Sequence, residues 1–213
     1  ANIYLGGAFT HLSGQGVSDS YGRSAARVSL SGRPDRSWNP EFNGTVIDID
    51  VDENETYYYA AGYFTRAHNR VVENAGRLST AAGAELDQSW TFRHSYLIGK
   101  YQQTVTAANG RVYFGGSQHS LFGYNSDSMT RTSGSITMNN GGDLQASTRS
   151  ATGVVYASCH CSDYTFQDAY QYLTLGTSWT RADEIQWVGG WDEATGRQLG
   201  WTPYRLASQR FTG

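Results

Sequence analysis

The sequence predicts an all-β protein, a β-propeller of about four four-stranded blades or an arc of a larger propeller. Two interleaved motifs lead to this prediction. A run of β-branched or aromatic residues followed by small residues recurs at intervals of 55, 54 and 43 residues, aligned on Tyr4, Tyr59, Tyr113 and Tyr156. A strand, a glycine turn and a tryptophan recur between these runs, at Trp38, Trp90 and Trp201. Two hairpins, and hence four strands, in a period of this size are the unit of a propeller blade.

The first hairpin of each blade is predicted from alternation and turn residues. Alternating runs at 46–51, 104–108 and 144–148 each precede a polar turn and then a tyrosine run. Two such runs around a turn make a β-hairpin, and the chain opens on the second half of another one. The small residues of the tyrosine runs mark places where backbones pack closely, at Gly6, Gly7, Gly62, Gly115 and Gly116.

The second hairpin of each blade is predicted at 26–40, 76–92 and 188–203. Arg27 and Arg77 hold equivalent places before the turns of the first two. A tryptophan that recurs in every repeat is expected to pack blade against blade, so the three tryptophans are predicted to be core residues. The alternative is that they stack on sugar rings, because a tryptophan face suits such a ligand.

Composition limits the domain count and the partners. The chain has 213 residues with 14% aromatic residues, 25 glycines and 3 prolines, which fits one β-rich domain over residues 1–213. The net charge is -3 with no long run of one sign, so nucleic acid is not an expected partner. No stretch has the length of an apolar membrane span, and no membrane insertion is expected. The first residue is Ala1, so we expect a processed product or a piece of a longer protein.

Several stretches resemble a known repeat family. They are IYLGGAFT at 3–10, AARVSLSG at 25–32, VYASCHCSDYTF at 155–166 and WDEATGRQLGWTP at 191–203. They are similar to the delta-60-like β-propeller repeats of secreted actinobacterial proteins and of minor tail proteins from phages that infect actinobacteria. The resemblance implies a propeller fold and a place in a virion tail, at the cell surface or outside the cell. It also implies other tail or surface proteins and cell-envelope glycan as partners, and it supplies no catalytic residues.

Ligand contacts are predicted in two irregular segments that interrupt the repeat, 117–135 and 160–186. Irregular loops on a rigid scaffold are where such folds usually place recognition. The second segment is rich in aromatic residues and poor in charge, which suits either a contact surface or a loop packed on its own propeller. The candidate ligand-binding residues are His119, Tyr124, Tyr164, Phe166, Tyr170, Tyr172 and Trp179.

The sequence Cys159-His160-Cys161 contains three residues of types that bind zinc. In a strand, Cys159 and Cys161 point to one side and His160 to the other, so the three cannot bind one ion together. We therefore predict a structural role for both cysteines and no metal; a disulfide between such near neighbours would close almost no loop.

The acidic strand from Asp48 to Asp52 lacks the glycine and the distal glutamate of an EF-hand loop. We interpret its carboxylates as a solvated strand face, with weak calcium binding as the alternative. No cofactor is predicted.

No catalytic constellation is evident. Gly-x-Ser-x-Gly and His-Glu-x-x-His are both absent, and the acidic pairs that begin at Asp183 and Asp192 point to opposite sides of a strand. Our leading hypothesis is a non-catalytic module for structural assembly and adhesion, a phage minor tail protein domain that contacts the actinobacterial cell envelope. The alternative is a secreted actinobacterial propeller protein that binds or hydrolyses carbohydrate. An open arc would leave unpaired strand edges, so a homo-oligomer is expected in that case.

Overall fold

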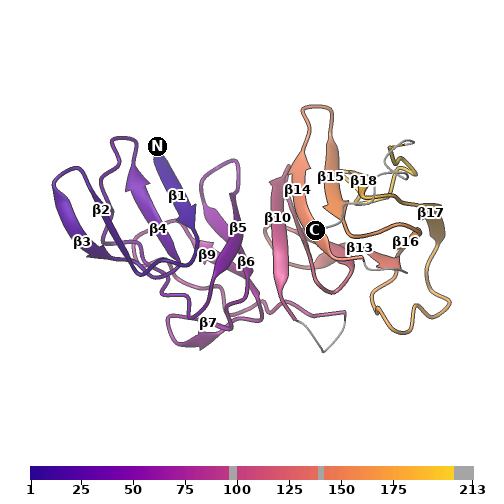
Figure 1. Ribbon diagram of the computed structural model, residues 1–213, viewed down its shortest axis with the longest axis horizontal. Coiled ribbons are helices and arrows are strands. Elements are labelled where there is room, and N and C mark those ends of the chain that lie inside the picture. Colours follow the sequence, from indigo (N-terminus) through magenta and orange to yellow (C-terminus); the bar gives the residue numbers. More distant parts are fainter. Residues whose placement is uncertain (96–99, 139–141, 204–213) are drawn as a thin grey trace. The chain divides into compact units, whose positions relative to one another are not determined.

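The computed structural model describes residues 1–95, 100–138 and 142–203. The regular secondary structure of these residues consists of β-strands (Figure 1). The chain divides into two compact units, Ala1–Arg93 and His94–Gly213. Strands pair antiparallel throughout and form blade sheets in sequence order, which confirms the all-β, propeller-type fold class. The assignment of residues 1–213 to one domain stays a prediction.

The first unit contains two blades, each with a small hairpin inserted before its last strand. Blade I consists of β1 (Asn2–Gly6) and β4 (Ala25–Ser29). Blade II consists of β5 (Val46–Val51), β6 (Tyr57–Gly62) and β9 (Ala75–Ser79). The inserted hairpins are β2 (His11–Gly14) with β3 (Val17–Tyr21) in blade I, and β7 (Arg66–Ala67) with β8 (Arg70–Val71) in blade II.

The second unit contains two further blades. Blade III consists of β10 (Gln102–Ala108), β11 (Arg111–Gly116), β12 (Ser120–Asn125) and β13 (Arg131–Met138). Blade IV consists of β14 (Leu144–Arg149), β15 (Val154–Cys159) and β18 (Val188–Asp192). The hairpin inserted in blade IV is β16 (Tyr164–Gln167) with β17 (Arg181–Glu184).

The fourth strand of the predicted blade is present in full only in blade III, among the described residues. In the other three blades it is reduced to one antiparallel bridge, Val28 to Pro34, Leu78 to Leu86, and Trp191 to Gln198. The β12–β13 pair meets the equivalent point at Tyr124 and Arg131. The sequence had suggested that segment 117–135 interrupts the repeat. This was wrong, because the segment is the regular second half of blade III.

The inserted hairpin of blade IV joins the sheet of blade III. Strand β16 pairs with β13, with Ile136 opposite Phe166, so that β10 to β13, β16 and β17 form one six-stranded sheet. Trp191 of blade IV also donates from Nε1 to the hydroxyl of Ser135 on β13 at 3.0 Å. Blades III and IV are thus connected by strand pairing as well as by side-chain packing.

The four repeat tyrosines occupy one register position. Tyr4, Tyr59, Tyr113 and Tyr156 each lie opposite a residue of the next strand in their blade, which is Arg27, Arg77, Gly123 and Gly190 in turn. In a strand, the residue before each tyrosine points to the opposite face of the sheet. A blade therefore has two faces, one with the tyrosine and one with the residue that precedes it.

In each unit the tyrosine face of the first blade packs on the second blade. Tyr4 contacts the Tyr58 ring of blade II, and the Tyr113 hydroxyl of blade III donates to the Glu193 carbonyl of blade IV at 2.6 Å. Both contacts join different blades within one unit. The tyrosine face is thus the forward face of a blade, toward the blade that follows it.

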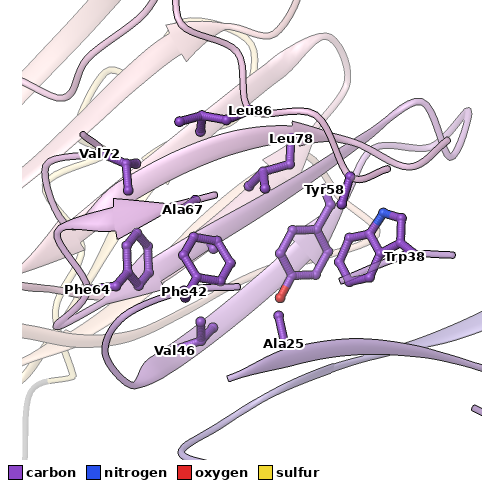
Figure 2. Close-up of a cluster of buried hydrophobic side chains, with 12 residues drawn as sticks. Ala25, Trp38, Phe42, Val46, Tyr58, Phe64, Ala67, Val72, Leu78 and Leu86 are labelled. Carbon is purple, nitrogen blue, oxygen red and sulfur yellow. The ribbon is translucent and has the colours of Figure 1, made fainter. Parts of the chain in front are cut away.

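The core of the first unit lies between blades I and II (Figure 2). Trp38 packs edge-on against Tyr58, with ring centroids 4.9 Å apart. The ring centroids of Phe42 and Phe64 are 4.2 Å apart. Figure 2 shows the rings of Trp38 and Tyr58 next to each other above Ala25. Aromatic pairs of this geometry add to the stabilisation from buried area.

Of the glycine positions predicted from the repeat, Gly62 and Gly116 are places of close backbone approach, whereas a Cβ on Gly6, Gly7 or Gly115 would first meet side chains. A Cβ on Gly62 would overlap the Thr45 carbonyl oxygen, and one on Gly116 would lie 2.5 Å from the Tyr101 carbonyl oxygen. Real Cβ atoms do not come so close to backbone atoms. These two glycines permit the irregular pairing at the starts of β5 and β10.

Candidate functional site

The candidate site lies on the β16–β17 hairpin of blade IV. The back of this hairpin is buried, with Thr165 and Gln167 at 3% and 6% exposure. Gln198 contacts both residues, because its Nε2 donates to the Thr165 carbonyl at 3.2 Å and its backbone N–H to Gln167 Oε1 at 3.3 Å. Strand β13 pairs along the hairpin edge, so the hairpin is positioned from two directions.

The front of the hairpin is a row of aromatic side chains, Tyr164, Phe166 and Trp179, which we call the aromatic row. Alternation along β16 turns Tyr164 and Phe166 to the same side. The ring centroids of Tyr164 and Phe166 are 6.3 Å apart, and those of Phe166 and Trp179 are 5.4 Å apart. Tyr164 and Trp179 are 40% and 39% exposed, so the row presents a solvent-accessible apolar surface, with Tyr164 and Phe166 on strand β16 and Trp179 in the connection that leads to β17.

One exposed carboxylate borders the aromatic row. Glu184 lies opposite Tyr164 in the β16–β17 register, while Ala182 lies opposite Phe166. The other charges of β17 pair with each other, with Arg181 Nε 2.8 Å from an Asp183 carboxylate oxygen. The surface therefore combines neighbouring rings, in tilted and edge-on contact, with an acceptor at one end, a combination suited to a neutral polar ligand that has an apolar face.

Two other candidate residues fold back onto blade III. Tyr170 covers Gly134 and packs on Phe122, and the Arg131 guanidinium lies 4.0 Å from the Tyr170 ring and 5.0 Å from the Phe122 ring. Burial and the nearby Asp168 raise the pKa of Tyr170, and Arg131 opposes this shift. Tyr170 therefore fastens its loop to the sheet.

The second fold-back contact involves His119 and Tyr172. His119 Nε2 lies 3.1 Å from an Asp143 carboxylate oxygen, and its ring meets the Tyr172 ring edge-on at 4.1 Å. The Tyr172 backbone N–H also donates to the Ser95 carbonyl at 3.2 Å. The insert thus divides into an exposed half, the aromatic row, and a half packed on its own unit. The packed-loop alternative applies to Tyr170 and Tyr172, and a contact surface stays a prediction for the aromatic row.

Tyr124 lies in the interior on β12, at 3% exposure, with its ring 6.0 Å from that of Phe114. It occupies the position of Leu78 in blade II and Trp191 in blade IV, so we leave it out of the candidate surface. The short continuous run Leu121, Phe122, Gly123, Tyr124, all buried, is the signal that identifies β12 as an interior blade strand.

The repeat tryptophans differ in burial. Trp38 is 1% exposed and donates from Nε1 to the Ser79 carbonyl at 3.0 Å, as expected for a residue that packs blade on blade. Trp90 is half-buried against Phe92. Trp201 is 48% exposed and meets the Tyr156 ring edge-on, with ring centroids 5.5 Å apart, so the prediction of a core position was wrong for this tryptophan.

The two cysteines are buried and bonded to each other. Cys159 and Cys161 are joined by a disulfide and are 4% and 0% exposed, in the core between blades III and IV. His160 points to solvent, within 3.0 Å of Gln145. Across residues 1–95, 100–138 and 142–203, no group of three metal-ligating side chains comes together.

The acidic strand uses its carboxylates on its own backbone. Asp48 and Asp50 each accept from the backbone N–H of the next residue, and Asp52 accepts from those of Thr56 and Tyr57 at 2.6 Å each. All three aspartates are half-buried, so this face is less solvated than the sequence indicated. The Asp52 contacts close the β5–β6 turn.

The two aspartates considered for glycoside hydrolysis both have structural partners. Asp183 accepts from Gln198 Nε2 at 2.6 Å and pairs with Arg181. Asp192 accepts from the Thr195 hydroxyl and backbone N–H, and the hydroxyl contact lowers the pKa of Asp192.

In the described part of the chain, no helix has the length and apolar character needed to cross a membrane.

These blades and their register define a β-propeller repeat protein. No protein-family model matches the chain, and no curated protein does. Among solved structures, the chain is similar to one titled as the structure of U3-55K, with a TM-score of 0.48 and 8% identity over 82% of this chain and 56% of that one. It is also similar to the crystal structure of RRP9 WD40 repeats, with a TM-score of 0.46 and 9% identity over the same shares. The chain spans little more than half the length of these structures, and likeness at this level adds no argument about function.

Proposed function

We propose that the chain is a non-catalytic β-propeller module for structural assembly and adhesion, and that the aromatic row is its contact surface. The exposed rings of Tyr164 and Trp179, joined by Phe166 between them, are the observation that supports this proposal. Interface energy concentrates in tyrosine and tryptophan residues, and rings held on a strand, as Tyr164 and Phe166 are on β16, lose little freedom on binding.

The setting proposed for this module is a phage tail tip that contacts the envelope of an actinobacterial host. The resemblance of the repeat motifs to minor tail proteins supports that setting, and neutral wall glycan is the ligand that suits the row. An aromatic face packs well on the apolar face of a sugar, and Glu184 could accept hydrogen bonds from sugar hydroxyls. A secreted actinobacterial propeller protein that binds carbohydrate would use the same surface.

The test is binding of the labelled chain to intact actinobacterial cells and to wall polysaccharide purified from them. The variant is Tyr164→Ala with Trp179→Ala, which removes two exposed rings and leaves the buried hairpin contacts in place. The matched control is Tyr63→Ala, because Tyr63 is 54% exposed and lies in the first unit. We expect the double variant to lose at least about tenfold in affinity, which corresponds to roughly 1.4 kcal/mol, and the control to bind as the unmodified chain does.

Each outcome bears on the proposal. Equal binding by the double variant and the unmodified chain would remove the aromatic row as the contact surface. Absence of binding by the folded, unmodified chain would refute the adhesion role. Saturable hydrolysis of the polysaccharide that is lost on Asp183→Asn would overturn the non-catalytic assignment.

A further inference from the structure

The forward face of blade IV repeats a surface that another blade covers elsewhere in the chain. In blade I, Tyr4 and Trp38 form an edge-on pair with ring centroids 5.2 Å apart and an interplanar angle of 78°. In blade IV, Tyr156 and Trp201 form the same pair at 5.5 Å and 71°. Tyr4 and Tyr156 share their register position, so these pairs are equivalent parts of the repeat.

In blade I, blade II covers this pair. The Tyr58 ring packs on both members, and the Trp38 Nε1 donates to the Ser79 carbonyl at 3.0 Å. Trp38 is consequently 1% exposed. The covering surface supplies two things, an apolar side chain at the Tyr58 position and a backbone carbonyl at the Ser79 position.

In blade IV, no second blade covers the pair within the described residues. Trp201 is 48% exposed, and beside Tyr156 lies a groove of about 220 Å³, which Ala146, Thr148, Ser158 and Val188 also line. Ala146 lies opposite Ser158, and Thr148 opposite Tyr156, so these residues share one side of the sheet. We call this surface the blade IV face. It is apolar and has the composition of an interface between blades.

The chain also has an exposed backward face that matches the surface covering Trp38. In blade I, Ile3 lies opposite Val28 as Tyr58 lies opposite Leu78 in blade II. Ile3 is 43% exposed, although Tyr58 at the equivalent position is fully buried. By register the Ser29 carbonyl is the equivalent of the Ser79 carbonyl; it accepts from the Gly32 backbone N–H at 2.9 Å, and a carbonyl oxygen has a second lone pair for a further donor. We call the exposed Ile3 with the Ser29 carbonyl, next to Val28 at 8% exposure, the blade I face.

We propose that the blade IV face of one molecule binds the blade I face of a second copy, so that molecules associate head to tail. Ile3 would occupy the groove next to Tyr156, and the Ser29 carbonyl would accept from Trp201 Nε1. The contact repeats the one that the chain makes between blades I and II. Because the two faces differ, each molecule keeps one of each free, and the contact leads to a ring or a filament. This inference does not depend on the adhesion role.

The experiment uses two variants that each block one face of the whole chain. Ile3→Glu places a charge on the blade I face, and Thr148→Arg places one in the groove of the blade IV face. A charge buried without a partner in an apolar interface is costly, so each variant should weaken self-association by at least about tenfold. Leu173→Glu, at a position that is 66% exposed and outside both faces, is the matched control.

Sedimentation velocity from about 1 µM to about 200 µM, a range that covers weak interfaces, measures the association. We expect concentration-dependent assembly of the unmodified chain and of the control, and monomers for each blocked variant alone. A mixture of the two blocked variants should form a 1:1 dimer, because each retains the face that the other has lost. Ala146→Arg blocks the same groove if Thr148→Arg fails to fold by circular dichroism.

Three results would overturn the proposal. One is an unmodified chain that stays monomeric over the whole range. Another is continued assembly of Ile3→Glu while Thr148→Arg is monomeric, which would indicate a symmetric contact between two blade IV faces. The third is the absence of a dimer in the mixture of two folded, monomeric variants.

Discussion

Trp191 and Trp201 permit a direct test of how burial between blades contributes to stability. Trp191 is 1% exposed in the core between blades III and IV, and its Nε1 donates to Ser135 at 3.0 Å. Truncating a buried tryptophan to alanine costs about 3–5 kcal/mol, and leaving the buried Ser135 hydroxyl without a partner adds roughly 1 kcal/mol or more. We therefore expect Trp191→Ala to lower the free energy of unfolding by about 4–6 kcal/mol.

The comparison is with Trp201→Ala, which removes the same side chain from a position that is 48% exposed. In a dilute sample we expect this change to cost less than about 1 kcal/mol, because surface substitutions have small effects. Urea unfolding followed by far-ultraviolet circular dichroism measures both, at a concentration too low for self-association.

Trp191→Phe combined with Ser135→Ala separates the hydrogen bond from the packing. A double-mutant cycle should give a coupling of about 0.5–1.5 kcal/mol for the bond itself. Equal losses for Trp191→Ala and Trp201→Ala would refute the claim that blade-to-blade burial holds the second unit together.

Two further predictions concern acid stability and a glycine. Burial raises the pKa of Asp87, but hydrogen bonds from Ser89 and the ion pair with Arg77 outweigh it, so the pKa is lowered in the folded state. This carboxylate therefore stabilises the folded state above its unfolded pKa of about 4. The stabilisation is lost as the pH falls through the folded pKa. We expect the urea midpoint of the unmodified chain to fall between about pH 5 and about pH 3, and Asp87→Asn to show a smaller fall. Gly134→Ala should cost about 1–3 kcal/mol in urea unfolding, since its Cβ would overlap the Tyr170 ring.

Each of these two predictions has a control. For the acid profile, Asp127→Asn replaces an exposed carboxylate outside this ion pair, and its pH profile should follow the unmodified chain. For the glycine, Gly190→Ala places a Cβ 3.4 Å from Val154 and 3.6 Å from Tyr156, which are ordinary contacts, and should be close to neutral. A Gly190→Ala loss as large as that of Gly134→Ala would contradict the steric argument.

The sequence predicted the blade strands because their signals are local. Alternation and turn residues place β5, β6, β14 and β15, and the glycines at close approaches were identified from the repeat alone. The reduced fourth strand could not be foreseen, because one bridge such as Leu78 to Leu86 has no periodicity. Segment 117–135 was misassigned because it lacks the glycine turn and the tryptophan on which the second hairpins of the other blades were aligned.

The candidate site was only partly predictable for a different reason. Composition identified the insert as rich in exposed aromatic residues, but its division depends on contacts between distant segments. Tyr172 reaches Ser95, and Tyr170 covers Gly134, and neither contact follows from spacing along the chain. The pairing of β16 with β13 likewise depends on tertiary packing, since strand register is set by which face is buried.

The pairing of β16–β17 with β13 also has a consequence for protein engineering. A sequence repeat is normally treated as a cassette that can be excised, duplicated or moved to another scaffold. Here the repeat that encodes blade IV contains the outermost strands of the blade III sheet. Deleting it would expose the β13 edge, and transplanting it alone would leave β16 without a neighbour on one side. The smallest transferable segment that includes the aromatic row is therefore the pair of blades III and IV.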